Sequence, residues 1–402
     1  MLRTLLLISA LGLLAVGLLT VVRAPTYNTW KLAILAGEFG HWVAGLALIV
    51  GGLALAQLAV GGGGVMARAV TWATLLLAVA AGVLLLRPRW EAWRIAKDLP
   101  ERLAAGLGEA KVRGPVLARG RWWRLPARGG EVAGVAKVET RVFAHAGTAD
   151  ELALDFYRPR GGLSDLPCIV VVHGGGWDGG DRRQLMEWNE LWAERGFAVA
   201  AVSYRLAPAH PWPAQREDLL AAIAWLKANA GELGISRDNF VLLGRSAGGQ
   251  IATATAYTAN DPAIRAVASF YSPYDLGFVW SIARPDDVLN SVKLLTQYLG
   301  GSPEQGREPL YESASPERLV RGPGVTPPTL LIHGALDELV WHKHSERLDA
   351  RLAEAGVPHY FLSLPWATHA CDFNPNGPSG QLIDYAVGWL LTVSTRPGYP
   401  NP

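Results

Sequence analysis

The sequence predicts an α/β protein with a mostly parallel sheet, preceded by a bundle of three membrane-spanning helices. Half of the 402 residues are hydrophobic, only 18% are charged, and the apolar excess is concentrated in the first 90 residues. From residue 135 onward, strand and helix patterns alternate instead. We therefore expect transmembrane helices over residues 1–88, a basic juxtamembrane linker over 89–134 and an α/β domain over 135–402.

Three charge-free apolar runs occupy residues 5–22, 42–60 and 69–86. Each approaches the roughly 20 residues that a helix needs to cross the hydrocarbon core of a bilayer, where only a helix satisfies its own backbone. Gly61–Gly64 separates the last two runs and predicts a tight hairpin. Tryptophans lie near the ends of the runs, as is typical of membrane interfaces: Trp30, Trp42, Trp72, Trp90 and Trp93.

The first run has a second interpretation as a cleaved signal peptide, because Arg3 precedes it. Two further runs follow, and no clean cleavage site closes the first run before Arg23, so we favour a retained helix. With three spans, the loops on the side of the main domain carry more Lys and Arg than those on the side of the N-terminus. The positive-inside rule then predicts a cytoplasmic main domain in a multi-pass membrane protein.

The linker combines basic and aromatic residues. Residues 90–110 favour one or two short helices, with Pro100 in a first helical turn. The following segment around Trp122 and Trp123 is expected either on an anionic membrane surface, in contact with membrane lipids, or packed against the main domain.

Composition excludes two classes of function. The first 98 residues contain eight of the 37 Lys and Arg but only three of the 35 Asp and Glu. The rest of the chain therefore carries 29 basic and 32 acidic residues. Such a slightly acidic domain lacks the basic footprint that nucleic acid requires. Two cysteines, Cys168 and Cys371, form neither a disulfide framework nor a Cys-based metal site. We expect buried thiols, with a single bridge as the alternative.

The main domain shows alternating strands and helices. Short apolar runs such as 168–172 are typical of strands buried on both faces. The segment 275–328 interrupts the alternation and is expected to overhang the site as a lid or pocket wall, with a plain surface helix pair as the alternative. The expected strands are 135–144, 152–157, 168–172, 197–203, 240–243, 266–271, 329–333 and 360–364, and the expected helices are 214–229, one from 247, 344–355 and 379–391.

The strongest chemical signal is a serine between two glycines, Gly244-Arg245-Ser246-Ala247-Gly248, between a strand and a helix. A tight strand-to-helix turn forces such a serine outward at the carboxyl edge of the sheet. The helix N-terminus behind it offers free N–H groups to a developing oxyanion. We therefore expect Ser246 to be a nucleophile.

A second signal is the glycine run His173-Gly174-Gly175-Gly176-Trp177, directly after the strand 168–172. Glycines let backbone N–H groups approach a ligand closely, which favours an oxyanion hole. A phosphate loop is the rival use, but no Gly-Lys-Ser/Thr follows. We expect His173 to fix the loop.

A serine nucleophile requires a base, and the base requires an orienting acid, in the chain order Ser, acid, His. Asp337 follows the strand 329–333 and fits the acid, with Glu338 as its nearest competitor. His369 follows the strand 360–364 and fits the base. His359 precedes its strand and lies at the wrong end of the sheet. The remaining cluster matches no standard metal motif: His333, His342 and His344.

Five motifs occur in order in the chain: HGGGW (173–177), SYRLAPAHPWPAQREDLLAAIAWLK (203–227), GRSAGGQIA (244–252), LLIHGALDELV (330–340) and ATHACDF (367–373). Together they resemble the hormone-sensitive-lipase-like esterases, which have the α/β-hydrolase fold. They are also similar to isoprenylcysteine-methylesterase-like and feruloyl-esterase-like relatives. The resemblance extends from about residue 135 to 395.

The resemblance implies that Ser246 is the nucleophile, His369 the base and Asp337 its orienting acid. It also implies an oxyanion hole from Gly175, Gly176 and the N–H of Ala247, with Gly174 replacing Gly176 if the loop is shifted. Two departures concern the substrate rather than the mechanism. Membrane spans stand where the family carries a helical cap, and Arg245 stands where an acidic residue is common. We expect Arg205 and Asp218 to form a structural pair.

The expected reaction is hydrolysis of a carboxylic ester, small or lipid-derived, through an acyl-serine intermediate without metal or organic cofactor. Two other functions use the same features. An amidase, peptidase or formamidase-like hydrolase would use the same site, and a non-catalytic membrane-bound binding protein would keep only the fold.

Overall fold

A computed structural model describes residues 1–112, 114–124, 135–161 and 164–395 of the chain. The main domain is built on one eight-stranded sheet with the order β1-β2-β4-β3-β5-β6-β7-β8. β1 and β2 pair antiparallel, β2 pairs antiparallel with β4, and every pair from β4 to β8 is parallel. The strands are β1 (Val135–Ala144), β2 (Leu152–Pro159), β3 (Leu166–Val172), β4 (Ala198–Val202), β5 (Ile235–Arg245), β6 (Ile264–Phe270), β7 (Thr329–Gly334) and β8 (His359–Leu364).

Each predicted strand is present, and the register brings the ends of distant strands together. Val172 at the end of β3 pairs with Gly244 near the end of β5. Gly334 at the end of β7 likewise pairs with Leu364 at the end of β8. Because parallel strands end at one edge of a sheet, the four loops that follow these strands start side by side.

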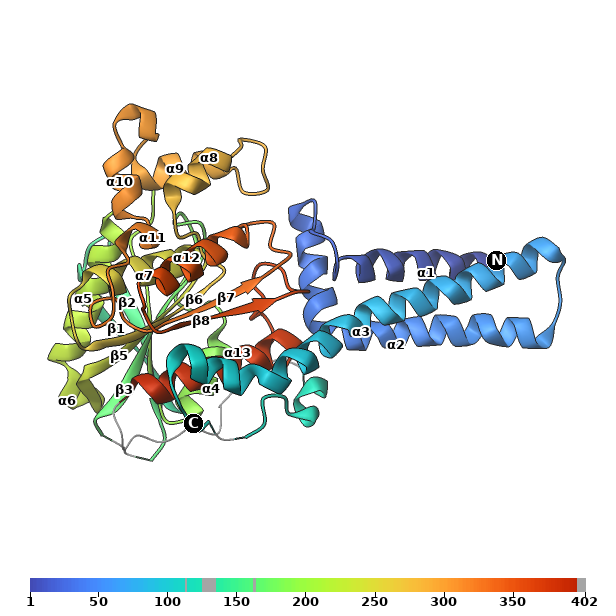
Figure 1. Cartoon of the computed structure of the whole chain (residues 1–402), viewed down its shortest axis with the longest axis horizontal. Helices are drawn as coiled ribbons and strands as arrows, with labels where there is room; N and C mark the ends of the chain where they lie inside the picture. Colours follow the sequence, from blue (N-terminus) through green and yellow to red (C-terminus); the bar gives the residue numbers. More distant parts are fainter. Residues whose placement is uncertain (113, 125–134, 162–163, 396–402) are drawn as a thin grey trace.

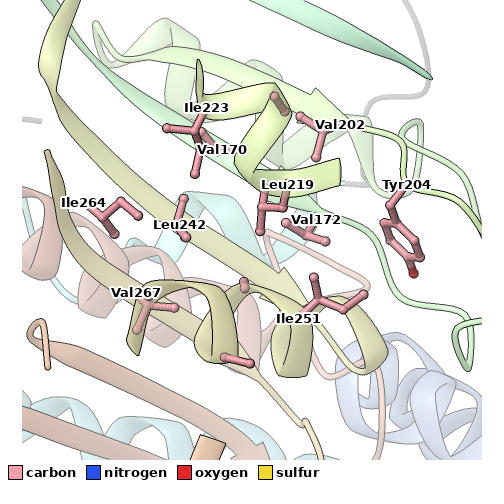
Figure 2. Packing of buried hydrophobic residues seen from close by; sticks show 14 of the residues in the cluster. Val170, Val172, Val202, Tyr204, Leu219, Ile223, Leu242, Ile251, Ile264 and Val267 are labelled. Carbon is pink, nitrogen blue, oxygen red and sulfur yellow. The ribbon is translucent and has the colours of Figure 1, made fainter. Parts of the chain in front are cut away.

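Both faces of the sheet are covered, as the apolar strands predict. Val170 and Leu242 belong to the core on one face, whereas their neighbours Ile169, Val171 and Leu243 belong to the core on the other. Side chains alternate between the faces of a strand, so uninterrupted apolar runs supply both cores. Figure 2 shows the first core, where strand residues such as Val170, Val172 and Leu242 pack around Leu219, Ile223 and Ile251.

The first face is covered mainly by α5 (Ala214–Ala228), α7 (Ala247–Thr258) and α12 (Lys343–Glu354), and the second by α4 (Met186–Glu194), α13 (Pro378–Ser394) and the end of α3. A short α6 (Ala230–Leu233) precedes β5. The segment between β6 and β7 folds into α8 (Leu276–Ile282), α9 (Ser291–Leu299), η2 (Pro303–Gln305), α10 (Glu308–Ser313) and α11 (Pro316–Leu319). In Figure 1, α8, α9 and α10 stand together beyond the sheet.

Three helices form a bundle that extends from the main domain, with the N-terminus at its far end (Figure 1). They are α1 (Leu2–Leu18), α2 (Tyr27–Val60) and α3 (Val65–Leu107). By length and composition, α2 and α3 qualify as membrane spans among the described residues, whereas α1 is apolar but shorter. The prediction of three spans is thus supported clearly for two helices.

Small residues let α2 approach its neighbours closely. Gly40, Ala44, Ala47, Gly51 and Ala54 recur at helical spacing and are all buried. A Cβ atom at Gly40 would lie 2.4 Å from the carbonyl oxygen of Leu85 in α3. Such stripes of small residues are typical of helices that pack through van der Waals contact in a membrane.

The linker differs from the prediction, because residues 90–107 form no separate short helices. Instead α3 is one helix of 43 residues that passes through Pro88 and Pro100, so the expected limit at residue 88 falls inside it. Proline removes the hydrogen bond to the carbonyl four residues earlier. The hydroxyl of Thr20 lies 3.1 Å from that carbonyl, at Leu84, and 2.8 Å from the carbonyl of Gly17, so it supplies a shared donor where Pro88 has none.

After α3, the chain forms η1 (Arg119–Trp123). Trp122 is buried and lies beneath the guanidinium of Arg89, whereas Trp123 is exposed beside Trp42. Trp122 thus packs against the main domain, as one of the two alternatives predicted, while the contact of this segment with membrane lipids stays a prediction. Part of the predicted linker, residues 125–134, lies outside the described residues. Cys168 and Cys371 are both free and buried, so the bridge does not form.

Candidate active site

Ser246 lies in the turn between β5 and α7 with φ 52° and ψ −121°. This backbone conformation is strained for any residue other than glycine. Neighbouring glycines make the turn possible, since a Cβ at Gly244 would lie 2.2 Å from the carbonyl oxygen of Gly248, and one at Gly248 would lie 2.2 Å from that of His173. Strain held by close packing is typical of a serine presented for nucleophilic attack.

The glycine loop after β3 lies beside this turn. The N–H of Gly174 already donates to Oε1 of Gln184 over 2.8 Å. Within the described chain, the N–H groups of Gly175, Gly176 and Ala247 have no protein acceptor, and all three residues line the same cavity as Ser246. Free amides at this position are suited to bind a developing oxyanion. Because the amide of Gly174 is already occupied, the geometry favours Gly175 and Gly176 as donors over the alternative in which Gly174 replaces Gly176.

His173, which we expected to fix this loop, is buried and donates from Nδ1 to the carbonyl of Gly174 over 2.9 Å. Its ring stacks on Tyr204 with the centroids 4.2 Å apart. The predicted structural pair also forms, since the guanidinium of Arg205 donates to the carboxylate of Asp218 over 2.7 Å.

Asp337 and His369 are brought together by the paired ends of β7 and β8. Nδ1 of His369 lies 2.6 Å from Oδ2 of Asp337. Oδ1 of Asp337 accepts from the N–H groups of Leu339 and Val340, each over 2.8 Å. Burial alone would raise the pKa of Asp337, but the charge of His369 and hydrogen bonds from His333 and His369 outweigh it and hold this pKa well below its usual range.

His333 is a partner of Asp337 that the sequence did not identify. Its Nε2 lies 3.1 Å from Oδ2 of Asp337, and its Nδ1 lies 2.7 Å from the hydroxyl of Ser345. The acid is therefore held by two histidines. The only hint in the sequence is the i, i+4 spacing within HGALD.

Other candidates take different positions. Oε2 of Glu338 accepts from the hydroxyl of Thr368 over 2.7 Å, so its hydrogen bond goes to Thr368 and not to His369. Burial, opposed by this hydrogen bond, raises the pKa of Glu338 to about 7. His359 opens β8 and lies 3.3 Å from Asp349, away from the cavity. Among the described residues, no cluster of three or more His, Cys, Asp or Glu side chains could bind a metal ion.

Arg245, the departure in the serine motif, points into the protein. It is 1% exposed and donates from Nε to Oδ2 of Asp372 over 2.5 Å, while the hydroxyl of Tyr271 donates to Oδ1 over 2.6 Å. Asp372 itself is fully buried. The turn that carries Ser246 is thereby tied to the loop that carries His369, and the ring of Tyr271 lies 4.5 Å from that of His369.

A cavity of about 650 Å³ contains these groups, which is the size of a typical small-molecule site. Ser246, His369 and the glycine loop all line it. The segment between β6 and β7 supplies apolar lining residues that include Ile282, Leu289 and Leu294. Tyr27 and Trp30 of α2 also line the cavity, a contribution that the sequence did not indicate.

The chain is similar to known esterases in sequence and in fold. The BD-FAE family model matches residues 154–352. The chain is 27% identical to the probable carboxylic ester hydrolase LipM of Mycobacterium tuberculosis, over 91% of this chain and 89% of LipM. It is 36% identical to an arylesterase of Saccharolobus solfataricus, over 56% of this chain and 73% of the arylesterase. The solved structure of a Pyrobaculum calidifontis esterase has a TM-score of 0.55 at 26% identity, over 65% of this chain and 87% of that one.

The chain belongs to the hormone-sensitive-lipase-like esterases. It is accordingly a carboxylic ester hydrolase, a serine hydrolase of the α/β-hydrolase fold, and not a non-catalytic binding protein. The alignment with LipM covers more of this esterase than residues 135–402 supply, so it extends into the preceding helices.

Proposed function

We propose that this esterase is anchored in a membrane by its three N-terminal helices and hydrolyses carboxylic esters through an acyl-serine intermediate on Ser246. The observation that carries the proposal is the single cavity that contains Ser246, the three free amides and His369, with Asp337 hydrogen-bonded behind the imidazole. Ester hydrolysis itself follows from the family, whereas the roles of these residues and the anchor are our proposal.

In this mechanism the oxygen of Ser246 attacks the ester carbonyl as Nε2 of His369 takes the serine proton. The bond to Asp337 keeps Nδ1 of His369 protonated, which leaves Nε2 free to accept. The imidazolium then gives its proton to the departing alcohol. Water attacks the acyl-serine in the same way, and the acid leaves with Ser246 restored.

The negative charge on the carbonyl oxygen would be held by the N–H groups of Gly175, Gly176 and Ala247. Removal of one such donor costs about 3 kcal/mol in the transition state. Ala247 begins α7, so its N–H also carries the positive end of a helix dipole. The stabilisation requires no cofactor.

Membrane anchoring is supported by the surface of the bundle. Only 28% of the most apolar window of α2 or of α3 is buried inside the protein. Leu48, Ile49, Leu76 and Val83 are each 60% exposed or more, and so large an apolar surface is not stable in water. The N-terminus and the Gly61–Gly64 hairpin lie at the far end, where Arg3 donates to Gly62. The positive charges near the main domain favour its cytoplasmic location.

The proposed substrates are esters with apolar acyl chains, including lipid-derived esters that partition into the membrane. The apolar cavity walls and the anchor support this class. The name of the Saccharolobus relative indicates that aryl esters belong in the first substrate screen.

The test uses a fluorophosphonate probe, which modifies an activated serine covalently, on the full-length protein in detergent. We expect labelling of the wild type and none of Ser246→Ala. Ser281→Ala, which removes an exposed serine in α8, is the matched control and should label normally. An unlabelled wild type, or a labelled Ser246→Ala variant, would refute the assignment of Ser246.

Substrate class is tested with acyl esters of increasing chain length, presented in solution and in lipid vesicles. Higher activity on long-chain esters in vesicles supports a lipid substrate. Higher activity on short soluble esters contradicts it. Matched amides in the same series test the amidase alternative, which predicts amide turnover at a rate comparable with that of the ester.

A further inference from the structure

The amino-terminal part of α2 lies between the bundle and the main domain (Figure 1). Tyr27, Trp30, Gly37, Glu38 and His41 recur at helical spacing and therefore share one face of this helix. Three of these residues, Trp30, Gly37 and Glu38, meet the loop that spans residues 366–379 and contains His369, whereas His41 contacts the carbonyl of Trp122. A helix of the proposed membrane bundle therefore contacts the loop that carries the proposed catalytic base, His369.

The contacts extend along the whole loop. Nε1 of Trp30 donates to the backbone carbonyl of His369 over 3.1 Å. Gly37 leaves room for Trp366, whose Cδ1 atom would lie 3.6 Å from a Cβ at that position. The carboxyl group of Glu38 accepts from the hydroxyl and the N–H of Ser379, at the start of α13. The loop is thus fixed at its two ends and beside the imidazole itself.

The same end of α2 forms part of the cavity. Tyr27 and Trp30 line it, with their ring centroids 5.0 Å apart. Three lining residues are also exposed apolar side chains, namely Tyr27 at 49%, Ile282 at 42% and Trp341 at 40%. They give the cavity an apolar rim, and Tyr27 lies five residues after the first predicted span.

We infer that α2 is part of the active site: Trp30 positions the loop of His369, and Tyr27 and Trp30 together form the wall of the acyl pocket on the membrane side. The inference rests on the proposed function, in which His369 is the base. It makes Trp30 a positioning residue and both aromatic residues determinants of acyl specificity. The preferred substrate class is then an ester whose acyl chain enters over this rim from the bilayer.

The test separates the two roles of Trp30 with two substitutions in the full-length enzyme. Trp30→Phe keeps most of the wall but loses the N–H donor. We expect kcat on a short soluble ester to fall about fivefold, the rate equivalent of one hydrogen bond, with KM unchanged. The rate of fluorophosphonate labelling should fall in parallel, because it depends on the same imidazole without acyl-chain binding.

Trp30→Ala loses both the donor and the wall. Its kcat should fall at least as far, and its chain-length preference should move toward longer or bulkier acyl groups. The matched controls are Trp42→Phe and Trp42→Ala, which alter an exposed tryptophan of the same helix that packs on Trp123 outside the cavity. Both controls should retain the kinetics of the wild type.

A Trp30→Phe enzyme with wild-type kcat and labelling rate would overturn the positioning role. A folded Trp30→Ala enzyme with the wild-type chain-length preference would overturn the wall. Both results leave the proposed function intact as long as wild type is labelled and Ser246→Ala is not. Failure of that labelling would instead refute the proposed function whatever the Trp30 variants do.

Discussion

α2 and α3 both continue from the bundle onto the main domain, but they meet it through different chemistry. α2 makes polar contacts with the loop of His369 and lines the cavity. α3 buries an apolar face, including Ala92, Leu99 and Leu103, against the core beneath α13 and β8. Within the described residues, no side chain of α3 lines the cavity.

The difference indicates that one helix holds the domain and the other shapes the site. Apolar burial stabilises without directing a particular atom, whereas a hydrogen bond to the carbonyl of His369 fixes a direction. We therefore expect substitutions on the α3 face to change stability at every pH, and those on the α2 face to change catalysis or the pH dependence of stability.

The largest expected effect comes from the other support of the His369 loop, the buried pair of Arg245 and Asp372. Arg245→Met leaves the carboxylate of Asp372 buried without its cation, which costs about 3–5 kcal/mol. Thermal unfolding and kcat should both be impaired, since the loop of His369 would lose its bond to the turn that carries Ser246. Arg245→Lys keeps the charge and should lose less. Normal stability in Arg245→Met would show that the pair is dispensable.

The next effect tests α3. Leu103→Ala removes a fully buried side chain and should destabilise the enzyme by about 2–5 kcal/mol, measured by denaturant or thermal unfolding in detergent. The kcat of the folded fraction should stay at the wild-type level. Glu101→Ala, on the exposed side of the same turn, is the control. A large loss of kcat in folded Leu103→Ala would contradict the division between the helices.

The smallest effect concerns Glu38 on α2. Burial raises the pKa of Glu38 from 4.5 to about 8, although hydrogen bonds from Ser379 act in the opposite direction. The folded state therefore keeps a proton that the unfolded state loses, and stability falls as pH rises from about 4.5 through 8. Glu38→Gln stays neutral, so its Tm should lack this decline and exceed that of the wild type by a few degrees at pH 9.

At pH 5, Glu38→Gln and wild type should melt at similar temperatures. Glu101→Gln, an exposed carboxyl on α3, serves as the control and should follow the wild-type profile. Parallel Tm curves for wild type and Glu38→Gln across this range would mean that the carboxyl group is not buried as described.

The sequence predicted the sheet well because its signals are local. Most of the expected strands are short apolar runs, and Asp337 and His369 are predicted because each follows a strand of the same edge. Their contact is confirmed, while their catalytic roles stay predictions. Local signals failed at Pro88, where the hydroxyl of Thr20, in the turn after α1, approaches the carbonyl of Leu84 that the proline leaves without its donor. They also failed at Trp30, whose partner His369 lies 339 residues away in the chain.

The burial of Arg245 was missed for a related reason. A charged residue in a serine turn is ordinarily read as a surface or substrate contact, because charges are rarely buried unpaired. Its partner Asp372 sits three residues after His369, in a motif noted only for the histidine. Nothing in the local pattern of either segment indicated that the two would meet.

The unbroken course of α3 also determines how the enzyme would search for substrate. A flexible linker lets a domain sample a wide volume around its anchor, but a helix rises 1.5 Å per residue along a fixed line. With the bundle in a bilayer, the mouth of the cavity would stay at one height and one orientation. Encounters with substrate would then depend on two-dimensional diffusion of the entire protein and of the lipids. The thickness of the bilayer and the tilt of the bundle in it would set how far an ester must emerge from the membrane to be cleaved.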